Sequence, residues 1–147
     1  MKSFKAKKVE MTQIFDESGE VFPVTLLVRS DDKQDLDAAS FAEGETVTVS
    51  GISKGKGFQG VVKRHKFQGG RRSHGQKHSE REAGSIGGGG RAGGRVVKGM
   101  RMAGRMGGEK VTVKNLKIVK ILPETREIFI SGAVPGRRGT LVEIKAQ

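Results

Sequence analysis

The sequence predicts an all-β domain, a barrel or a sandwich, interrupted by a long irregular extension that is basic and rich in glycine. Short apolar segments separated by turn residues occupy both ends of the chain, and no amphipathic helix of any length accompanies them. Between them, residues 53–108 hold 17 of the 23 glycines, and Ile86 is nearly the only large apolar residue between positions 69 and 94.

The strands predicted in the N-terminal part come in chain order. Segments 9–15 and 21–28 are rich in β-branched and aromatic residues and flank a turn at 16–19, with Pro23 near a sheet edge. Segment 46–49 alternates with period two, and 60–64 is expected to be a short strand that leads into the extension. The acidic stretch 31–40 predicts one helical turn at most.

After the extension, segment 110–114 alternates and 116–118 continues on the opposite phase, so Asn115 is a predicted bulge. A turn at 123–126 leads into a strand at 127–130, and 141–144 is the last strand. The chain is therefore expected to divide into a first part of the barrel (1–64), the extension (65–106) and a second part of the same barrel (107–147). Core positions are expected for the phenylalanines on or beside strands, which are Phe4, Phe15, Phe22 and Phe129.

The positive charge is confined to the middle of the chain. The sequence holds 28 Lys and Arg against 16 Asp and Glu, a net charge of +12, and residues 53–105 contain 14 of the basic and 2 of the acidic residues. The remainder is neutral, with 14 of each sign. A charge of this size favours a polyanionic partner. The segment buries too little apolar surface to offset its ordering entropy, so we expect it to be mobile alone and ordered by its partner.

Several classes of protein are disfavoured. The chain has no cysteine, which excludes disulfides and thiolate metal sites. No apolar run reaches membrane-spanning length, the N-terminus lacks a signal-peptide pattern, and no amphipathic helix could lie on a membrane surface. We therefore expect a soluble cytoplasmic protein with no membrane partner.

The candidate RNA-binding side chains lie in and beside the extension. Lysines meet phosphates, arginines grip phosphates bidentately or stack on bases, and histidines bond to RNA or stack on it. The set is Lys54, Lys56, Lys63, Arg64, Lys66, Arg71, Arg72, His74, Lys77, His78, Arg91, Arg95, Lys98, Arg101 and Arg105. The glycines expected to let the backbone approach RNA closely are Gly55, Gly57, Gly60, Gly84, Gly87 and Gly88.

Other interpretations of these residues are weaker. Residues 55–60 fit G-x-G-x-x-G, but a dinucleotide site needs a following helix, and 61–65 has the composition of a strand. His74 and His78 have the spacing of a helical metal pair, yet Gly75 and the local charge disfavour a helix and no third ligand is well placed. We expect no catalytic residue, metal or cofactor. Phe58 and Phe67 either anchor the base of the extension or contact RNA.

Five ordered motifs carry a family resemblance. Segments 7–15, 50–60, 84–87, 98–107 and 132–136 resemble the bacterial large-subunit ribosomal protein L-three family. The resemblance implies a six-stranded Greek-key barrel of the translation-protein type, also called the reductase-isomerase-elongation-factor type. It implies binding to large-subunit rRNA beside neighbouring ribosomal proteins, an extension toward the peptidyl transferase centre and an early role in assembly. It implies neither an enzyme nor a small-molecule substrate.

This chain departs from the family pattern at three places. Glu10 stands where the pattern has glycine, and the stretch 29–41 is much shorter, which leaves open whether the barrel closes. Gly88, Gly89 and Gly90 stand where the family often carries a methylatable glutamine, so that modification is not expected. The alternative functions are a non-ribosomal RNA-binding or RNA-chaperone protein and, because related barrels occur in flavin reductases, an enzyme, although no cofactor motif supports the latter.

Overall fold

The computed structural model describes residues 2–30, 41–87 and 93–147. The chain forms two compact units. The barrel unit comprises Met1–Lys54 and Gly108–Gln147, and the second unit, here called the arm, comprises Gly55–Gly107. In the described parts of the chain, no helix is long and apolar enough to cross a membrane. The helical turn expected within 31–40 lies outside the described residues.

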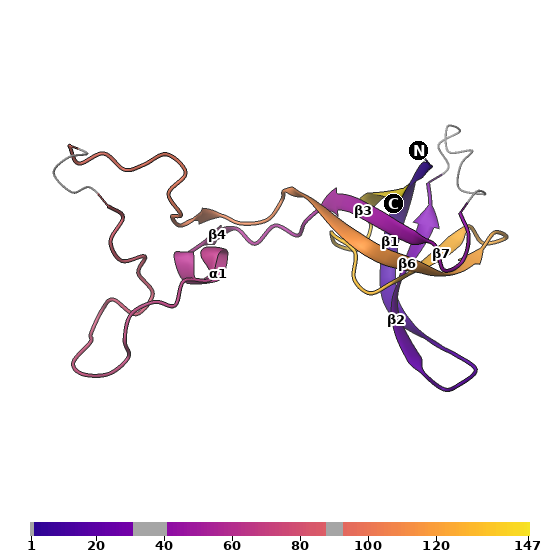
Figure 1. Ribbon diagram of the computed structural model, residues 1–147, viewed down its shortest axis with the longest axis horizontal. Helices are drawn as coiled ribbons and strands as arrows, with labels where there is room; N and C mark the ends of the chain where they lie inside the picture. The colour runs from indigo at the N-terminus through magenta and orange to yellow at the C-terminus, as the bar shows by residue number, and fades with distance from the viewer. Residues whose placement is uncertain (1, 31–40, 88–92) are drawn as a thin grey trace. The chain divides into compact units, whose positions relative to one another are not determined.

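Six antiparallel strands close a barrel in the first unit (Figure 1). Around the barrel the order is β1-β2-β7-β6-β3-β8, and β8 pairs back onto β1. Strands β3, β6 and β7 are successive neighbours and β8 returns beside β3, which is a Greek key. The predicted all-β class and six-stranded barrel are confirmed, and the short 29–41 stretch does not prevent closure. The bounds are β1 (Ser3–Phe15), β2 (Val21–Arg29), β3 (Thr46–Ile52), β6 (Lys110–Leu122), β7 (Glu127–Ser131) and β8 (Leu141–Ala146).

Alternating apolar side chains fill the barrel. Phe4 on β1 lies opposite Ile144 on β8, which lies opposite Val49 on β3, and all three are buried. Phe41 packs edge-to-face on Phe4, with 5.1 Å between ring centroids. Each such side chain contributes about 1.5–3 kcal/mol through burial, so these strands are held chiefly by their inward faces.

A buried lysine fastens the loop between β7 and β8. Lys8 is 8% exposed, and its Nζ donates to the carbonyl oxygens of Val134 at 2.9 Å and Gly136 at 3.2 Å. Thr25 donates to the carbonyl of Gly132 in the same loop. Burial lowers the pKa of the Lys8 ammonium, and the positive charge of Lys54 lowers that pKa further. The amine satisfies backbone oxygens that would otherwise lack a partner.

The predicted bulge is confirmed. Val47 pairs with Leu116 and Val49 pairs with Val113, so two residues of β6 oppose one residue of β3. Asn115 adopts a φ of 60°, in the left-handed region that asparagine tolerates better than most residues. The extra residue reverses the phase of β6 and keeps Val113 and Leu116 both facing the interior.

The core expectation for Phe15 and Phe22 is wrong. β8 pairs with β1 only over Ser3–Lys7, so the far end of β1 and the start of β2 form a two-stranded ribbon that extends past the barrel. Phe15 is 62% exposed there, and Phe22 is exposed as well. The sequence pattern shows that these residues are in strands, but not where the neighbouring strands end.

Candidate nucleic-acid interface

The arm starts as a narrow two-stranded stem. β4 (Phe58–Gln59) pairs with β5 (Gly104–Arg105), with Phe58 opposite Arg105. Closer to its base, Met106 donates to the carbonyl of Gly57 and accepts a hydrogen bond from the amide of Lys56, each at 2.9 Å. This stem joins the outgoing and returning segments by backbone hydrogen bonds, so the two ends of the arm are held together as a hairpin.

The strand expected at 60–64 is wrong, because this segment forms the helix α1 (Val61–His65). Pairing with the returning chain ends at Gln59 and Gly104, so the segment has no partner strand. Local hydrogen bonding replaces it: the amide of Arg64 donates to the carbonyl of Gly60 at 2.9 Å. Lys66 then ends the helix in the left-handed conformation. The β propensity of the two valines is overridden by the absence of a partner.

Side chains of α1 hold the returning chain. The Arg64 guanidinium donates to the carbonyl of Met102 at 2.8 Å, and the His65 ring lies 2.9 Å from the same oxygen. Gly104 leaves room for this contact, since a Cβ there would lie 2.6 Å from Arg64 Nη1. Arg64 therefore has a structural contact within the arm besides its expected role toward RNA.

Two adjacent glycines close a loop farther out. The amide of Gly70 donates to the carbonyl of Glu80 at 3.0 Å. Gly69 has a φ of +80°, and a Cβ at Gly69 would overlap the carbonyl oxygen of Glu80. Arg72 and Glu80 form an exposed ion pair at 3.8 Å, a kind of contact worth little in water. A backbone hydrogen bond and the close contact of Gly69 with the Glu80 carbonyl, rather than side-chain packing, keep this loop closed.

Nearly all the expected RNA-binding cations that are described are exposed. Arg64 is half-buried, and Gly88 and Arg91 lie outside the described residues. Among the described arm residues only Val61 is buried, at 5% exposure. The exposed set is Lys54, Lys56, Lys63, Lys66, Arg71, Arg72, His74, Lys77, His78, Arg95, Lys98, Arg101 and Arg105. The fold thus presents these cations to solvent instead of using them within a core.

One of the expected glycines, Gly55, has no role that the chain itself explains, whereas Gly60 is the N-cap residue of α1, a position where glycine is favoured. At Gly55 and Gly60 a Cβ would meet nothing within 4 Å, and neither residue has a positive φ. Gly57, Gly84 and Gly87 also have open space beside them, but each has a positive φ that favours glycine for conformational reasons.

The two phenylalanines at the arm's base differ. Phe58 is 73% exposed, which disfavours an anchoring role. Phe67 is half-buried, tilts against His65 with 6.0 Å between ring centroids, and lines an open hollow of about 440 Å³ with Gln68 and Glu82. Phe67 therefore contributes to arm structure while its hollow stays accessible.

The metal and nucleotide interpretations find no geometry to support them. His74 and Gly75 both have positive φ, so no helix places His74 and His78 together. Across residues 2–30, 41–87 and 93–147, no group of three or more His, Asp or Glu residues could hold a metal ion. A helix does follow Gly55–Gly60, contrary to expectation, but it spans five residues and follows a strand of an antiparallel hairpin, not a strand of the βαβ unit of a dinucleotide site.

Sequence reasoning omitted one exposed cation of the arm. Arg81 is exposed and lies between Glu80 and Glu82 in the sequence. Because acidic residues flank it, it does not belong to a run of basic residues and was not predicted to bind RNA. Its place in the same glycine-rich segment was the signal that could have found it.

The fold and the site define a class: a Greek-key barrel protein with a cationic, glycine-rich arm inserted between two barrel strands. The family model described as Ribosomal protein L3 matches residues 1–127. The chain belongs to the ribosomal protein L3 family.

Individual relatives agree with that assignment. "Large ribosomal subunit protein uL3" of Chlorobium limicola is 58% identical over 105 residues, which cover 71% of this chain and 50% of that protein. The protein of the same name from Chlorobaculum parvum is 57% identical over 104 residues, covering 71% and 49%. The chain thus spans about half the length of these relatives. The Acidothermus cellulolyticus protein of that name is 35% identical over 205 residues, covering 99% of this chain and 92% of the relative.

Proposed function

We propose that this chain is a structural constituent of the large ribosomal subunit that binds large-subunit rRNA through its arm. The observation that carries the proposal is the arm's surface: its described cations are exposed apart from the half-buried Arg64, and only Val61 is buried among its described residues. A segment of this composition gains little from folding on itself and much from neutralising phosphates. Family membership supports rRNA as the polyanion.

Gly55 supports close contact between backbone and RNA. Neither internal crowding nor a positive φ explains Gly55, whereas an approaching phosphate would need the space that a side chain would fill. Lys54 and Lys56, both exposed, flank Gly55 and would meet the same phosphates. The stem is then the part of the arm where backbone amides and lysine ammonium groups act together.

In this proposal the arm extends toward the peptidyl transferase centre, and the barrel rests on rRNA beside other large-subunit proteins. The contribution is to assembly and architecture, with no chemical step assigned to any side chain. Arg72, whose exposed ion pair with Glu80 spans 3.8 Å, exchanges that weak surface contact for charge-assisted bonds to phosphate. The ribosome of the cytoplasm is the expected location.

Sedimentation through a high-salt gradient tests the proposal. A tagged copy of the full chain, expressed in the organism that encodes it, should co-migrate with large subunits and remain bound where loosely attached proteins are released. A Lys120→Gln variant, altered in the barrel unit at a lysine outside the proposed binding set, should behave identically. Recovery in light fractions, or with RNAs other than large-subunit rRNA, would instead identify a non-ribosomal RNA-binding or chaperone protein.

A further inference from the structure

One outer face of the barrel carries a polar row that no local sequence pattern reveals. Lys5 on β1 lies opposite Glu143 on β8, Glu143 lies opposite Ser50 on β3, and Ser50 lies opposite Thr112 on β6. Residues directly opposite in antiparallel strands share a face. The neighbouring row of Phe4, Ile144 and Val49 points into the core, so the polar row points outward.

Lysines surround that row, although the chain outside its middle segment is neutral overall. In the three described ladders β1–β8, β8–β3 and β3–β6, Glu143 is the single carboxylate among the outward-facing residues. The outward-facing cations of those ladders are Lys5, Lys7, Lys110, Lys117 and Lys145. Strand pairing has thus gathered lysines from both ends of the sequence onto one face, while acids such as Asp16, Glu17 and Glu20 lie on the β1–β2 turn.

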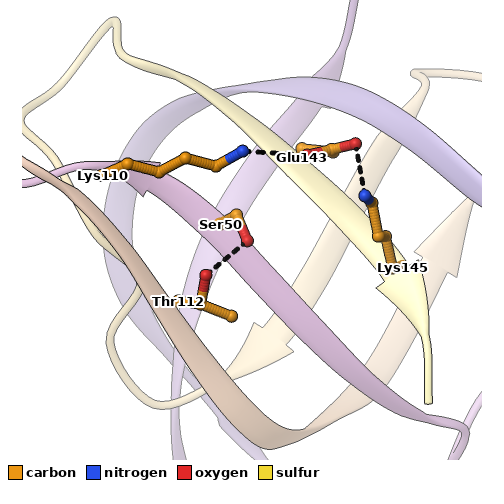
Figure 2. Close-up of polar contacts among 5 residues, drawn as sticks. All are labelled: Ser50, Lys110, Thr112, Glu143 and Lys145. Atoms are coloured by element: carbon orange, nitrogen blue, oxygen red, sulfur yellow. Dashed lines mark hydrogen bonds and ion pairs between the residues drawn. The ribbon is translucent and has the colours of Figure 1, made fainter.

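Glu143 sits between two of these lysines (Figure 2). Its Oε1 lies 2.9 Å from Lys145 Nζ and its Oε2 lies 3.8 Å from Lys110 Nζ, so each carboxylate oxygen faces a different ammonium group. The hydrogen bond from Lys145 is the main cause that lowers the pKa of the Glu143 carboxyl, which therefore stays ionised at neutral pH. Beside them, the hydroxyls of Ser50 and Thr112 are 2.8 Å apart and exposed, within the same view.

We infer that this outer face of β1, β8, β3 and β6 is a second RNA-binding surface, on which Glu143 occupies the place that a backbone phosphate takes in the complex. The inference rests on the proposed function and deepens it, because it names the barrel face that contacts rRNA and the residues that hold the phosphates. Two free phosphate oxygens present the same geometry to two ammonium groups as the two oxygens of Glu143 do. Exposed Ser and Thr hydroxyls are among the side chains that contact phosphate and the ribose 2′-hydroxyl.

The net positive charge of this face favours a nucleic-acid backbone over a protein as its binding partner. Five lysines against one carboxylate give a net charge of +4 on the outward side of those ladders. Interfaces between proteins favour aromatic and arginine side chains and are depleted in lysine, whereas phosphate recognition uses lysine as a point charge. Residues i and i+2 of one strand are about 7 Å apart, so Lys5 and Lys7 on the outward side of β1 can address successive phosphates along an RNA backbone.

Three single variants of the full chain test the inference: Lys110→Gln, Lys145→Gln and Glu143→Gln. The matched control is Lys120→Gln, an exposed lysine of the same strand β6 that pairs with β7 and lies outside the ladders of this face. Affinity for in-vitro-transcribed large-subunit rRNA is measured across a salt series. Loss of either lysine should reduce the log–log salt slope by about 0.7–0.9. Glu143→Gln should tighten binding and steepen the slope, because both lysines are released, and the control should leave the slope unchanged.

The outcomes separate this inference from the proposed function. If Arg71 and Arg72 variants of the arm reduce the slope while the three face variants do not, the barrel face does not bind RNA and the arm proposal stands. If Lys120→Gln weakens binding as much as Lys110→Gln, the effect is one of overall charge and the face is refuted. Weaker binding by Glu143→Gln would show that the carboxylate positions the lysines and is not displaced by phosphate. If no arm or face variant changes the slope, both proposals fail.

Discussion

Excising the arm separates its role from that of the barrel. Gln59 and Gly104 lie directly opposite each other in the stem, so a two-residue Asn-Gly turn can replace residues 60–103. The excised segment contains eleven Lys and Arg and two Glu, so the net charge falls from +12 to +3. Lys56 and Arg105 remain on the stem, and Lys54 remains at the end of the barrel unit. The change removes most of the proposed interface while leaving every barrel strand intact.

The expected effect on stability is small and favourable. Replacing a 44-residue excursion by two residues reduces the loop-closure entropy cost by about 2–3 kcal/mol, from the (3/2)RT ln n dependence. Among the described residues of the removed segment only Val61 is buried, and it belongs to the arm unit. The barrel's thermal unfolding midpoint should therefore stay the same or rise, as followed by circular dichroism.

The expected effect on RNA binding is large. If six of the eleven removed cations contact phosphates, the log–log salt slope should fall by about 4–5, with residual binding left to the stem and the barrel face. Filter binding to large-subunit rRNA over a salt series measures it. An unchanged slope with a folded barrel would refute the assignment of the arm as the main binding element. Loss of the unfolding transition would show that the arm completes the barrel's core.

Other predictions address single features. Changing Arg71 and Arg72 together to Ala should lower the salt slope by up to about 1.8 without moving the unfolding midpoint; an unchanged slope would place both side chains in solvent within the complex. Gly69→Ala should open the loop that Glu80 closes, because the new Cβ overlaps a carbonyl oxygen, and limited proteolysis near that loop should accelerate. In the free protein, amides of 69–87 should exchange quickly and those of β7 slowly; uniform protection would contradict this. Lys8→Met should cost about 1–3 kcal/mol of unfolding free energy by orphaning two carbonyls. The lowered pKa of Lys8 also predicts that wild-type stability rises, relative to this variant, as pH increases through the folded pKa toward the ordinary lysine value, because the unfolded chain then binds more protons; parallel pH profiles would refute it.

Much of the barrel is predictable from the sequence because its strands are amphipathic over short distances. The alternation of 46–49 and 110–114, the turns at 16–19 and 123–126, and the phase change at Asn115 are local signals, and each corresponds to a feature of the structure. The error at 60–64 has the opposite cause. Two valines favour a strand, but a strand needs a partner, and nothing in the local sequence shows that pairing ends at Gln59.

The candidate site divides in the same way. The arm's cations are contiguous in the sequence, so composition is enough to find them. The lysine-rich barrel face is assembled from Lys5, Lys110 and Lys145, whose strands β1, β6 and β8 are joined through β3 only when the barrel closes. Counting charges along the chain gives zero for that part, because the count ignores which side of the sheet each residue occupies. Register, not composition, reveals this face.

A cryo-EM map of the large ribosomal subunit from the organism that encodes this chain tests the central claim most directly. The account predicts density for the chain in which residues 55–107 are enclosed by rRNA and the arginines and lysines of the arm lie against phosphates. Subunits that lack the chain altogether, or a map in which the arm lies in solvent or only against protein, would contradict it.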